Sequence, residues 1–168
     1  DDVESRGLGD VYKRQRMESL GCELGNHTYS HVDLTTLAPE DMSAEIAGVD
    51  EDLVNLVGHG ATVLRPPYGN INDSVRSTVG TPMILWSIDT LDWETQDASQ
   101  ITEAVMSQVQ DGSIILMHDI FSTSVDAAEI FIPKLIEEGY QLVTIHELAK
   151  IKGTELTTGI AYGDFTGQ

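Results

Sequence analysis

The sequence is short of basic residues, of cysteine and of long apolar runs. Lysine and arginine together number 9 against 28 aspartate and glutamate residues, so a chain of 168 residues carries a formal net charge of −19. That imbalance argues against nucleic acid as a partner, because phosphates would be repelled, and it disfavours an anionic membrane surface. We expect the chain to bind cations or neutral ligands, although surface acidity alone explains the charge about equally well.

The single cysteine, Cys22, excludes an internal disulfide and a cysteine-based zinc site. We expect its side chain to be a small buried filler. No apolar run approaches the ~20 residues that a membrane span needs, and no signal peptide is visible. Hydrophobic residues make up 40% of the chain, which is enough to build the core of one globular domain.

The first residues do not resemble the rest of the chain. Asp10–Gln15 reads Asp-Val-Tyr-Lys-Arg-Gln, which is the translation of a transposon end used to prepare sequencing libraries. We therefore predict that residues 1–15 are a non-native, adapter-derived segment; a genuine charged helix start is the alternative. Residues 16–152 form the predicted domain, and residues 153–168 form a C-terminal tail, rich in glycine and threonine, that we expect to loop over the surface.

From Arg16 onward, short apolar runs alternate with amphipathic stretches. Pro39 fits the first position of a helix whose apolar residues recur at helical spacing until Gly58. A second helix is predicted over residues 125–138, with a kink or a division at Pro133. Strands are predicted over residues 83–88, 113–117 and 141–144. Strands that alternate with helices predict an α/β fold with a parallel sheet, open or closed into a barrel, and ligands at the carboxyl ends of its strands.

Two histidines four residues apart occur in Asn26–His31, which reads Asn-His-Thr-Tyr-Ser-His. Residues at this spacing share one face of a helical turn. Two neutral imidazoles so placed, His27 and His31, can bind one zinc, iron or cobalt ion. Two unrelated polar histidines at a helix start would explain the pair about as well, and no third ligand is adjacent.

The second segment of interest, Leu64–Asn70, follows a β-prone stretch and reads Leu-Arg-Pro-Pro-Tyr-Gly-Asn. Arg65 could orient a carboxylate. The two prolines stiffen the backbone, so a nearby N–H group could be aimed at a reacting oxygen. Taken alone, this segment is more simply interpreted as an ordinary Pro-Gly turn.

Two further segments each begin where a predicted strand ends. Ile88–Trp93 puts a carboxylate beside an aromatic side chain, which suits sugar binding, although a capping aspartate and a core tryptophan would look alike. Ile115–Asp119 ends an apolar strand in His118, which could act as a general acid or base. A hydrogen-bonded histidine at the edge of the core is the alternative interpretation.

Together and in this order, the four segments resemble the motifs of the polysaccharide deacetylases of carbohydrate esterase family four, the NodB-homology domain. The family patterns are His-Ser/Thr-x-x-His, Arg-x-Pro-Tyr, Asp-x-x-Asp-Trp and Leu-x-His. They stand here at His27–His31, Arg65–Tyr68, Asp89–Trp93 and Leu116–His118. The resemblance runs from about Arg16 to Leu148, and the segment Ile115–Val125 is most similar to peptidoglycan N-acetylglucosamine deacetylases of Gram-positive bacteria.

The resemblance implies a deformed (β/α) barrel with mostly parallel strands. It implies a metal-dependent hydrolase that removes the N-acetyl group from N-acetylglucosamine residues of a polysaccharide, peptidoglycan foremost, in an extracellular or cell-wall setting. His27 and His31 would be metal ligands, for zinc foremost, with cobalt, iron or nickel as alternatives. The metal would polarise the acetyl carbonyl and lower the pKa of its bound water.

The remaining roles also come from the resemblance. The backbone N–H of Tyr68 would hold the oxyanion, His118 would protonate the leaving amine, and Asp92 would hydrogen-bond His118. Arg65 would orient the catalytic base, and Leu116 would line the pocket for the acetate methyl group. The walls of the sugar groove are implied to be Pro67, Tyr68 and Trp93.

The chain also departs from the family. The family opens with a strand ending in Thr-Phe-Asp-Asp-Gly, whose first aspartate is the base and whose second is the third metal ligand, and this sequence has no such motif. We therefore expect a barrel without its first strand, weak metal binding and poor turnover. Glu94 stands where many relatives carry a basic residue. The alternatives are a chitin or acetylxylan deacetylase, a catalytically silent glycan-binding protein on the same scaffold, and a metal-free sugar isomerase-like barrel.

Overall fold

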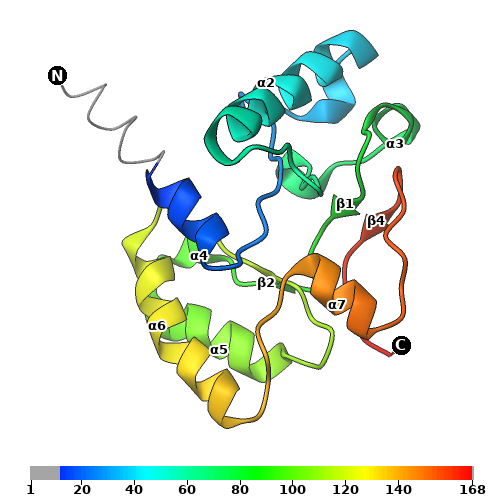
Figure 1. The fold of residues 1–168 in the computed structure, drawn as a ribbon. Helices are drawn as coiled ribbons and strands as arrows, with labels where there is room; N and C mark the ends of the chain where they lie inside the picture. The colour runs from blue at the N-terminus through cyan, green and yellow to red at the C-terminus, as the bar shows by residue number, and fades with distance from the viewer. Residues whose placement is uncertain (1–11, 168) are drawn as a thin grey trace, which may run out of the picture. The chain divides into compact units, whose positions relative to one another are not determined.

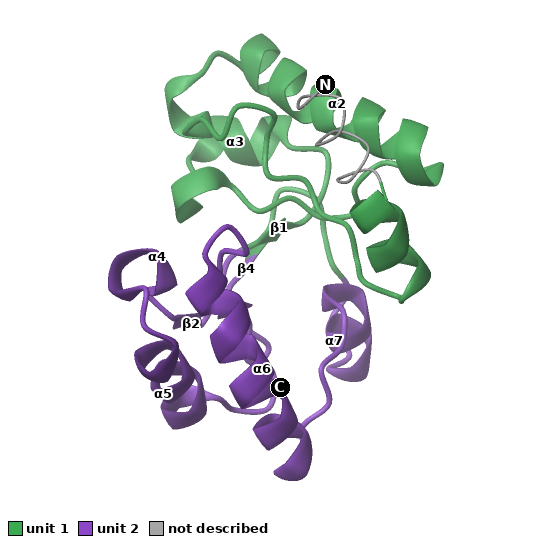
Figure 2. Ribbon diagram, turned by 90° about the vertical axis from the view of Figure 1, so that its left-hand side faces the viewer, with its two compact units in different colours: residues 1–84, 156–161 green, residues 85–155, 162–168 purple. Residues whose placement is uncertain are grey.

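The computed structural model describes residues 12–167. The prediction of an adapter-derived segment therefore falls mostly on residues that lie outside the described part of the chain. The chain divides into two compact units, shown in different colours in Figure 2. The first comprises residues 1–84 and 156–161, and the second comprises residues 85–155 and 162–168.

Helices supply most of the regular structure of the first unit. Residues 12–19 are helical, and Gly21 follows at a φ of 85°. The other elements are η1 (Leu34–Thr36), α2 (Pro39–Val57), η2 (Pro67–Gly69), α3 (Asp73–Thr78) and β1 (Met83–Ile84) (Figure 1). The prediction for α2 is confirmed, since Pro39 is its first residue and Gly58 caps its end at a φ of 88°.

Three extended segments of the first unit lie side by side. Asn26 forms a parallel bridge with Leu64, and Leu64 forms another with Met83. The Met83 N–H donates to the Ile160 carbonyl at 2.9 Å, just before β4 (Ala161–Tyr162). Because the first three segments are parallel, the residues that follow Asn26 and Leu64 emerge at the same edge, and these residues belong to the first two motifs.

The core of the first unit joins its helices to these segments. Its buried side chains are Leu34, Met42, Leu64, Val75, Val79 and Met83. The expectation that Cys22 is buried filler is wrong, because this residue is exposed in the turn after the first helix.

The second unit contains a parallel strand pair and a pair of packed helices. In β2 (Ile88–Asp89) and β3 (Ile115–Leu116), Ile88 lies opposite Ile115 and Asp89 lies opposite Leu116. The helices are α4 (Asp92–Thr95), α5 (Ala98–Gln108), α6 (Ser122–Glu137) and α7 (Ile145–Ile151). Helices α5 and α6 share a core made of Ile101, Val105, Ala127, Phe131 and Leu135.

Two predicted elements of the second unit differ from the structure. Pro133 does not divide α6, because the helix buries Phe131 and Leu135 on either side of it, and that burial outweighs one lost hydrogen bond. Residues 141–144 are not a strand, and Leu142 and Val143 within them are exposed.

The tail predicted over residues 153–168 does not simply loop over the surface. The Phe165 side chain is fully buried, and its N–H donates to the Gly112 carbonyl at 2.8 Å. A Cβ atom at Gly112 would lie 2.5 Å from the Phe165 backbone, so only glycine allows this approach. Phe165 therefore packs within the second unit, whereas residues 156–161 of the tail belong to the first.

The described residues form an α/β arrangement with parallel strands, but no closed sheet occurs among them. They contain two two-stranded sheets and two isolated bridges, and each named strand is two residues long. The expected run over residues 83–88 is likewise interrupted and appears as β1 and β2. The predicted barrel is thus not confirmed. Between residues 12 and 167, none of the helices has the length and apolar character needed to cross a bilayer.

Candidate functional site

His27 and His31, the predicted metal ligands, lie in a loop of the first unit. This loop is not the helical turn that the spacing suggests, because Thr28 and His31 take left-handed φ values of 65° and 53°. The two imidazoles nevertheless meet, with ring centroids 4.8 Å apart and planes inclined by 75°. The left-handed backbone therefore brings the two imidazoles together, as a helical turn was expected to do.

The orientation of His27 is fixed by the main chain of the second motif. Its Nδ1 atom lies 2.6 Å from the Arg65 carbonyl oxygen. A carbonyl oxygen only accepts hydrogen bonds, so Nδ1 carries the proton and Nε2 keeps a lone pair that can bind a cation. The His31 ring meets the Tyr68 ring edge to face, with centroids 5.1 Å apart.

A buried asparagine holds the loop in this conformation. Asn26 accepts the Thr28 N–H on its side-chain oxygen at 2.9 Å. Its side-chain amide donates to the Ile46 carbonyl at 2.9 Å and to Asp50 Oδ1 at 3.2 Å. Asn26 thus ties the left-handed turn between the histidines to helix α2.

A glutamate of α2 makes a second attachment. Glu45 Oε2 accepts the Ser30 N–H at 2.7 Å, and Oε1 accepts the Ser30 hydroxyl at 2.8 Å. The Tyr29 N–H donates to the Glu45 carbonyl at 3.1 Å. The hydrogen bond from the Ser30 N–H holds the pKa of Glu45 below its ordinary value. The roles of Asn26 and Glu45 in holding the loop were not predicted. The apolar spacing of α2 shows which face of the helix is buried, but it does not show which of its polar residues bonds to the loop.

The two imidazoles are side chains of a kind that can bind a metal ion. Zinc in proteins takes three or four protein ligands, and imidazole also suits cobalt, iron and nickel. The chemistry of the two rings fits two of those positions. Across residues 12–167, no group of three or more histidine, cysteine, aspartate or glutamate side chains could hold a metal ion.

The second motif forms a tight turn beside this loop. The Arg65 N–H donates to the Asn26 carbonyl at 2.8 Å, and burial lowers the pKa of the Arg65 guanidinium. Tyr68 lies in η2 at a left-handed φ of 60°, and its side chain is 65% exposed. Of the two groove-wall residues predicted here, Tyr68 presents a surface, whereas Pro67 is buried.

The third and fourth motifs meet in the second unit. Asp92, at the start of α4, is fully buried. His118 donates to it twice, from Nδ1 to Oδ1 at 2.8 Å and from its main-chain N–H to Oδ2 at 2.6 Å. Both motifs follow the carboxyl ends of the parallel strands β2 and β3, as expected for the working edge of such a sheet.

Two more hydrogen bonds complete the environment of this carboxylate. The Trp93 N–H donates to Oδ1 at 3.0 Å, and the Ser124 hydroxyl donates to Oδ2 at 2.6 Å. Burial by itself would raise the pKa of Asp92, but the hydrogen bonds from Ser124 and His118 outweigh it, so the pKa lies below its ordinary value. Ser124 was not predicted, because nothing in its local sequence distinguishes it from other serines near a helix start.

The two remaining predicted residues of the second unit differ in exposure. The Trp93 side chain is 51% exposed and offers an apolar face to solvent. Leu116 is buried in β3, and its carbonyl accepts the Thr90 hydroxyl at 2.8 Å. Trp93 can therefore contact a ligand directly, while Leu116 helps to shape the end of the strand pair.

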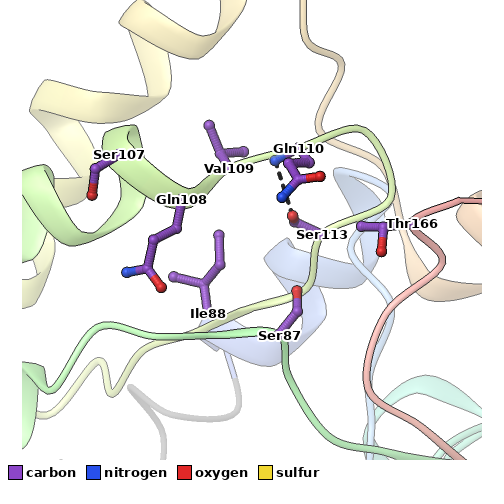
Figure 3. A pocket seen from close by; sticks show the side chains of 8 residues that line it. All are labelled: Ser87, Ile88, Ser107, Gln108, Val109, Gln110, Ser113 and Thr166. Atoms are coloured by element: carbon purple, nitrogen blue, oxygen red, sulfur yellow. Dashed lines mark hydrogen bonds between the residues drawn. The ribbon is translucent and has the colours of Figure 1, made fainter.

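A separate cavity of about 420 Å³ lies in the second unit (Figure 3). Its lining is uncharged and includes Ser87 and Ser113, which precede β2 and β3. The cavity therefore lies toward the amino ends of these parallel strands, opposite the edge that carries Asp92 and His118. None of the predicted site residues is among those that line it.

Comparison with known proteins places these motifs in a family. Residues 11–81 match the family model described as polysaccharide deacetylase. The peptidoglycan-N-acetylmuramic acid deacetylase PdaC of Bacillus subtilis is 42% identical over 137 residues, which are 82% of this chain and 29% of that protein. The peptidoglycan-N-acetylglucosamine deacetylase PgdA of Listeria monocytogenes is 36% identical over 164 residues, which are 98% of this chain and 34% of that protein. The chain thus spans about a third of the length of these curated relatives.

Solved structures agree with this assignment. The structure of T48 deacetylase with substrate matches with a TM-score of 0.86 and 36% identity, and covers 90% of this chain and 75% of that one. A family 4 acetyl xylan esterase from Clostridium thermocellum, in complex with a cobalt ion, matches with a TM-score of 0.86 and 27% identity over 93% of this chain and 78% of that one. The chain belongs to the polysaccharide deacetylase family, as its four motifs predict.

Proposed function

We propose that the chain is part of a hydrolase that removes the N-acetyl group of N-acetylglucosamine residues in peptidoglycan, in a metal-dependent reaction at the cell wall. Because this sequence lacks the Thr-Phe-Asp-Asp-Gly motif, we expect the chain itself to turn over poorly. The observation that carries the proposal is the fully buried Asp92 carboxylate, 2.8 Å from Nδ1 of His118. A carboxylate that accepts Nδ1–H fixes the tautomer of the imidazole and leaves Nε2 for proton transfer. The peptidoglycan deacetylases PdaC and PgdA, which this chain resembles, support the choice of substrate.

In this proposal, the residues of the second unit handle the proton. A water oxygen adds to the acetyl carbon while the family's base, the first aspartate of the opening motif, takes a proton from that water. His118 delivers a proton from Nε2 to the nitrogen of the leaving amine as the carbon–nitrogen bond breaks, which releases acetate and the free amine. Asp92 stabilises the protonated imidazole through the Nδ1 hydrogen bond. Trp93 covers an apolar face of the sugar, and Leu116 borders the acetate methyl group.

The residues of the first unit bind the cation and orient the acetyl group. His27 and His31 hold a divalent ion, zinc foremost, with cobalt, iron or nickel as alternatives; the relative that contains cobalt supports a divalent ion in general. When bound, the ion polarises the acetyl carbonyl. The Tyr68 N–H stabilises the developing oxyanion. Arg65 would orient the catalytic base of the family, the first aspartate of the opening motif, which this sequence does not contain. We also propose that the chain is part of the deformed barrel of the family. Its proposed partner is an N-acetylated glycan polymer.

The test measures acetate released from peptidoglycan, from N-acetylglucosamine oligomers and from acetylxylan, with Zn²⁺ or Co²⁺ added. We expect His118→Ala to lower the rate by about 10²–10⁴-fold. His146→Ala, which changes an exposed histidine of the same unit, should leave the rate unchanged. Acetate release that survives His118→Ala would refute the proposal, and release from acetylxylan alone would assign the chain a different substrate.

The metal part of the proposal is measured in the same samples by calorimetric titration with Co²⁺. Removing either imidazole, in His27→Ala or His31→Ala, should weaken binding by about tenfold or more. His59→Ala is the matched control, since this histidine belongs to the same unit and contacts Glu18 at 3.7 Å instead. Equal Co²⁺ affinity in all three variants would exclude the loop as the metal site.

A further inference from the structure

Ser124 occupies an unusual place on helix α6. It is the third residue of the helix and is 2% exposed. The buried residues of α6 are Ser124, Ala127, Phe131 and Leu135. Ser124 is thus the one polar side chain among them. Alanine would fill a buried helical position at no cost in hydrogen bonds and with better helix propensity, so packing alone does not explain a serine here.

The hydroxyl has one specific partner, the carboxylate of Asp92. The distance from Ser124 Oγ to Asp92 Oδ2 is 2.6 Å, which is typical of a hydroxyl bonded to an ionised carboxylate. Of the four donors to this carboxylate, two are main-chain N–H groups that any residue would supply, and a third is the His118 ring. The Ser124 hydroxyl is the fourth donor. It is the one donor that comes from a side chain outside the four motifs, so it would be lost if residue 124 were not a hydroxyl residue.

The Ser124 hydroxyl affects the orientation of the Asp92 carboxylate relative to the His118 ring. Oδ2 accepts Ser124 Oγ and the His118 N–H, and this places Oδ1 toward His118 Nδ1. Without the hydroxyl, Oδ2 would keep a single donor in a fully buried site, and the carboxylate could rotate or take up a proton. The Ser124 hydrogen bond is also the largest of the contributions that lower the pKa of Asp92.

We propose that Ser124 is a positioning residue whose hydroxyl orients the Asp92 carboxylate, so that Asp92 holds the proton of His118 on Nδ1 and leaves Nε2 for the substrate. The use of Nε2 as the acid rests on the function proposed above. The placement of the proton on Nδ1 does not, and it can be measured without any reaction.

The experiment reads the His118 tautomer from the ¹⁵N chemical shifts of its ring in the full chain, at a pH where the ring is neutral. Wild type should show the proton on Nδ1. In Ser124→Ala, the ratio of the Nδ1–H to the Nε2–H form should fall by on the order of tenfold. Ser122→Ala changes an exposed serine of the same turn and should leave the ratio as it is in wild type.

A second pair of variants separates the hydroxyl from the shape of the side chain. Threonine and valine have nearly the same shape, and only threonine keeps the hydroxyl. Ser124→Thr should retain the Nδ1–H form, whereas Ser124→Val should lose it, even if both lower the melting temperature equally. A Ser124→Val protein that is folded and keeps the wild-type ratio would overturn the proposal.

The acetate assay then separates this proposal from the proposed function. If both hold, acetate release in Ser124→Ala should fall by about tenfold at an unchanged KM, and Ser124→Thr should restore it. If His118→Ala leaves acetate release unchanged while Ser124→Val still shifts the tautomer, the proposed function fails and the role of Ser124 stands. If His118→Ala abolishes release while Ser124→Val changes neither the tautomer nor the rate, the role of Ser124 fails and the function stands.

Discussion

The two units hold their histidines by different physical means. In the first unit, His27 and His31 lie in a loop with left-handed backbone, and Asn26 and Glu45 accept N–H groups of that loop. In the second unit, the ring and the main chain of His118 are both bonded directly to a fully buried carboxylate. One arrangement orients histidines through the backbone, and the other through a charge.

The difference matches what each histidine is proposed to do. A metal ligand must be neutral, and a carbonyl partner such as that of Arg65 sets the tautomer of His27 without adding a charge. A general acid must carry an extra proton in part of its cycle, and an adjacent anion stabilises that state. We therefore expect substitutions around His27 and His31 in the first unit to change metal affinity. Substitutions around His118 in the second unit should change proton transfer.

The largest expected effect comes from removing the charge in the second unit. Asp92→Asn keeps the shape of the side chain but cannot supply an anion, and its amide can face Nδ1 of His118 with a donor. We expect acetate release to fall by about 10²–10⁴-fold. The affinity for Co²⁺ should stay within about twofold of wild type, because the histidine loop is untouched. A Co²⁺ affinity that falls along with the rate would show that the two units are not separable in this way.

The next effect is expected in the first unit. Asn26→Ala removes one accepted and two donated hydrogen bonds and releases the Thr28 turn. Calorimetry should show Co²⁺ affinity lowered by about 10–100-fold. Asn70→Ala is the control, because Asn70 belongs to the same unit and bonds only Asp33 through its side chain, at 2.7 Å. Equal affinities in the two variants would contradict a role for Asn26 in holding the loop.

The fold was predictable where the pattern is local. The apolar spacing and the Pro39 and Gly58 signals locate α2, and the apolar run over residues 113–117 contains β3. The run over residues 83–88, by contrast, is divided between β1 and β2. The tail was not predictable, because burial of Phe165 depends on contact with Gly112, which is remote in the sequence. Nor was the uninterrupted α6 predictable, since the packing that overrides Pro133 is tertiary.

The candidate site was predictable as residue types and not as geometry. The motifs identify His27 and His31, but the spacing suggests a helical turn where the structure has left-handed backbone. They also identify Asp92 and His118, but not Ser124, whose partner is 32 residues away in sequence. Residues that support a site from another element carry no local signature, because their role exists only after the chain has folded.

The smallest expected effect is a pH dependence that compares the two carboxylates. The folded pKa values of Asp92 and Glu45 both lie below the ordinary ones, for Asp92 because the hydrogen bonds from Ser124 and His118 outweigh burial, and for Glu45 because of the hydrogen bond from the Ser30 N–H. Each ionised group therefore stabilises the fold above its unfolded pKa, about 4 for either side chain, and that contribution is lost as the pH falls through the folded value.

Urea unfolding between about pH 6 and pH 2 measures this difference. The difference in unfolding free energy between wild type and Asp92→Asn should narrow as the solution becomes acidic. Protonation of Asp92 in the wild type removes the negative charge, which the asparagine variant lacks at every pH. The difference for Glu45→Gln should narrow less, since Glu45 is only partly buried whereas Asp92 is fully buried. If the difference in unfolding free energy narrowed equally for Asp92→Asn and Glu45→Gln, burial would not distinguish the two carboxylates. The histidines of the two units would then differ only in the geometry of their partners.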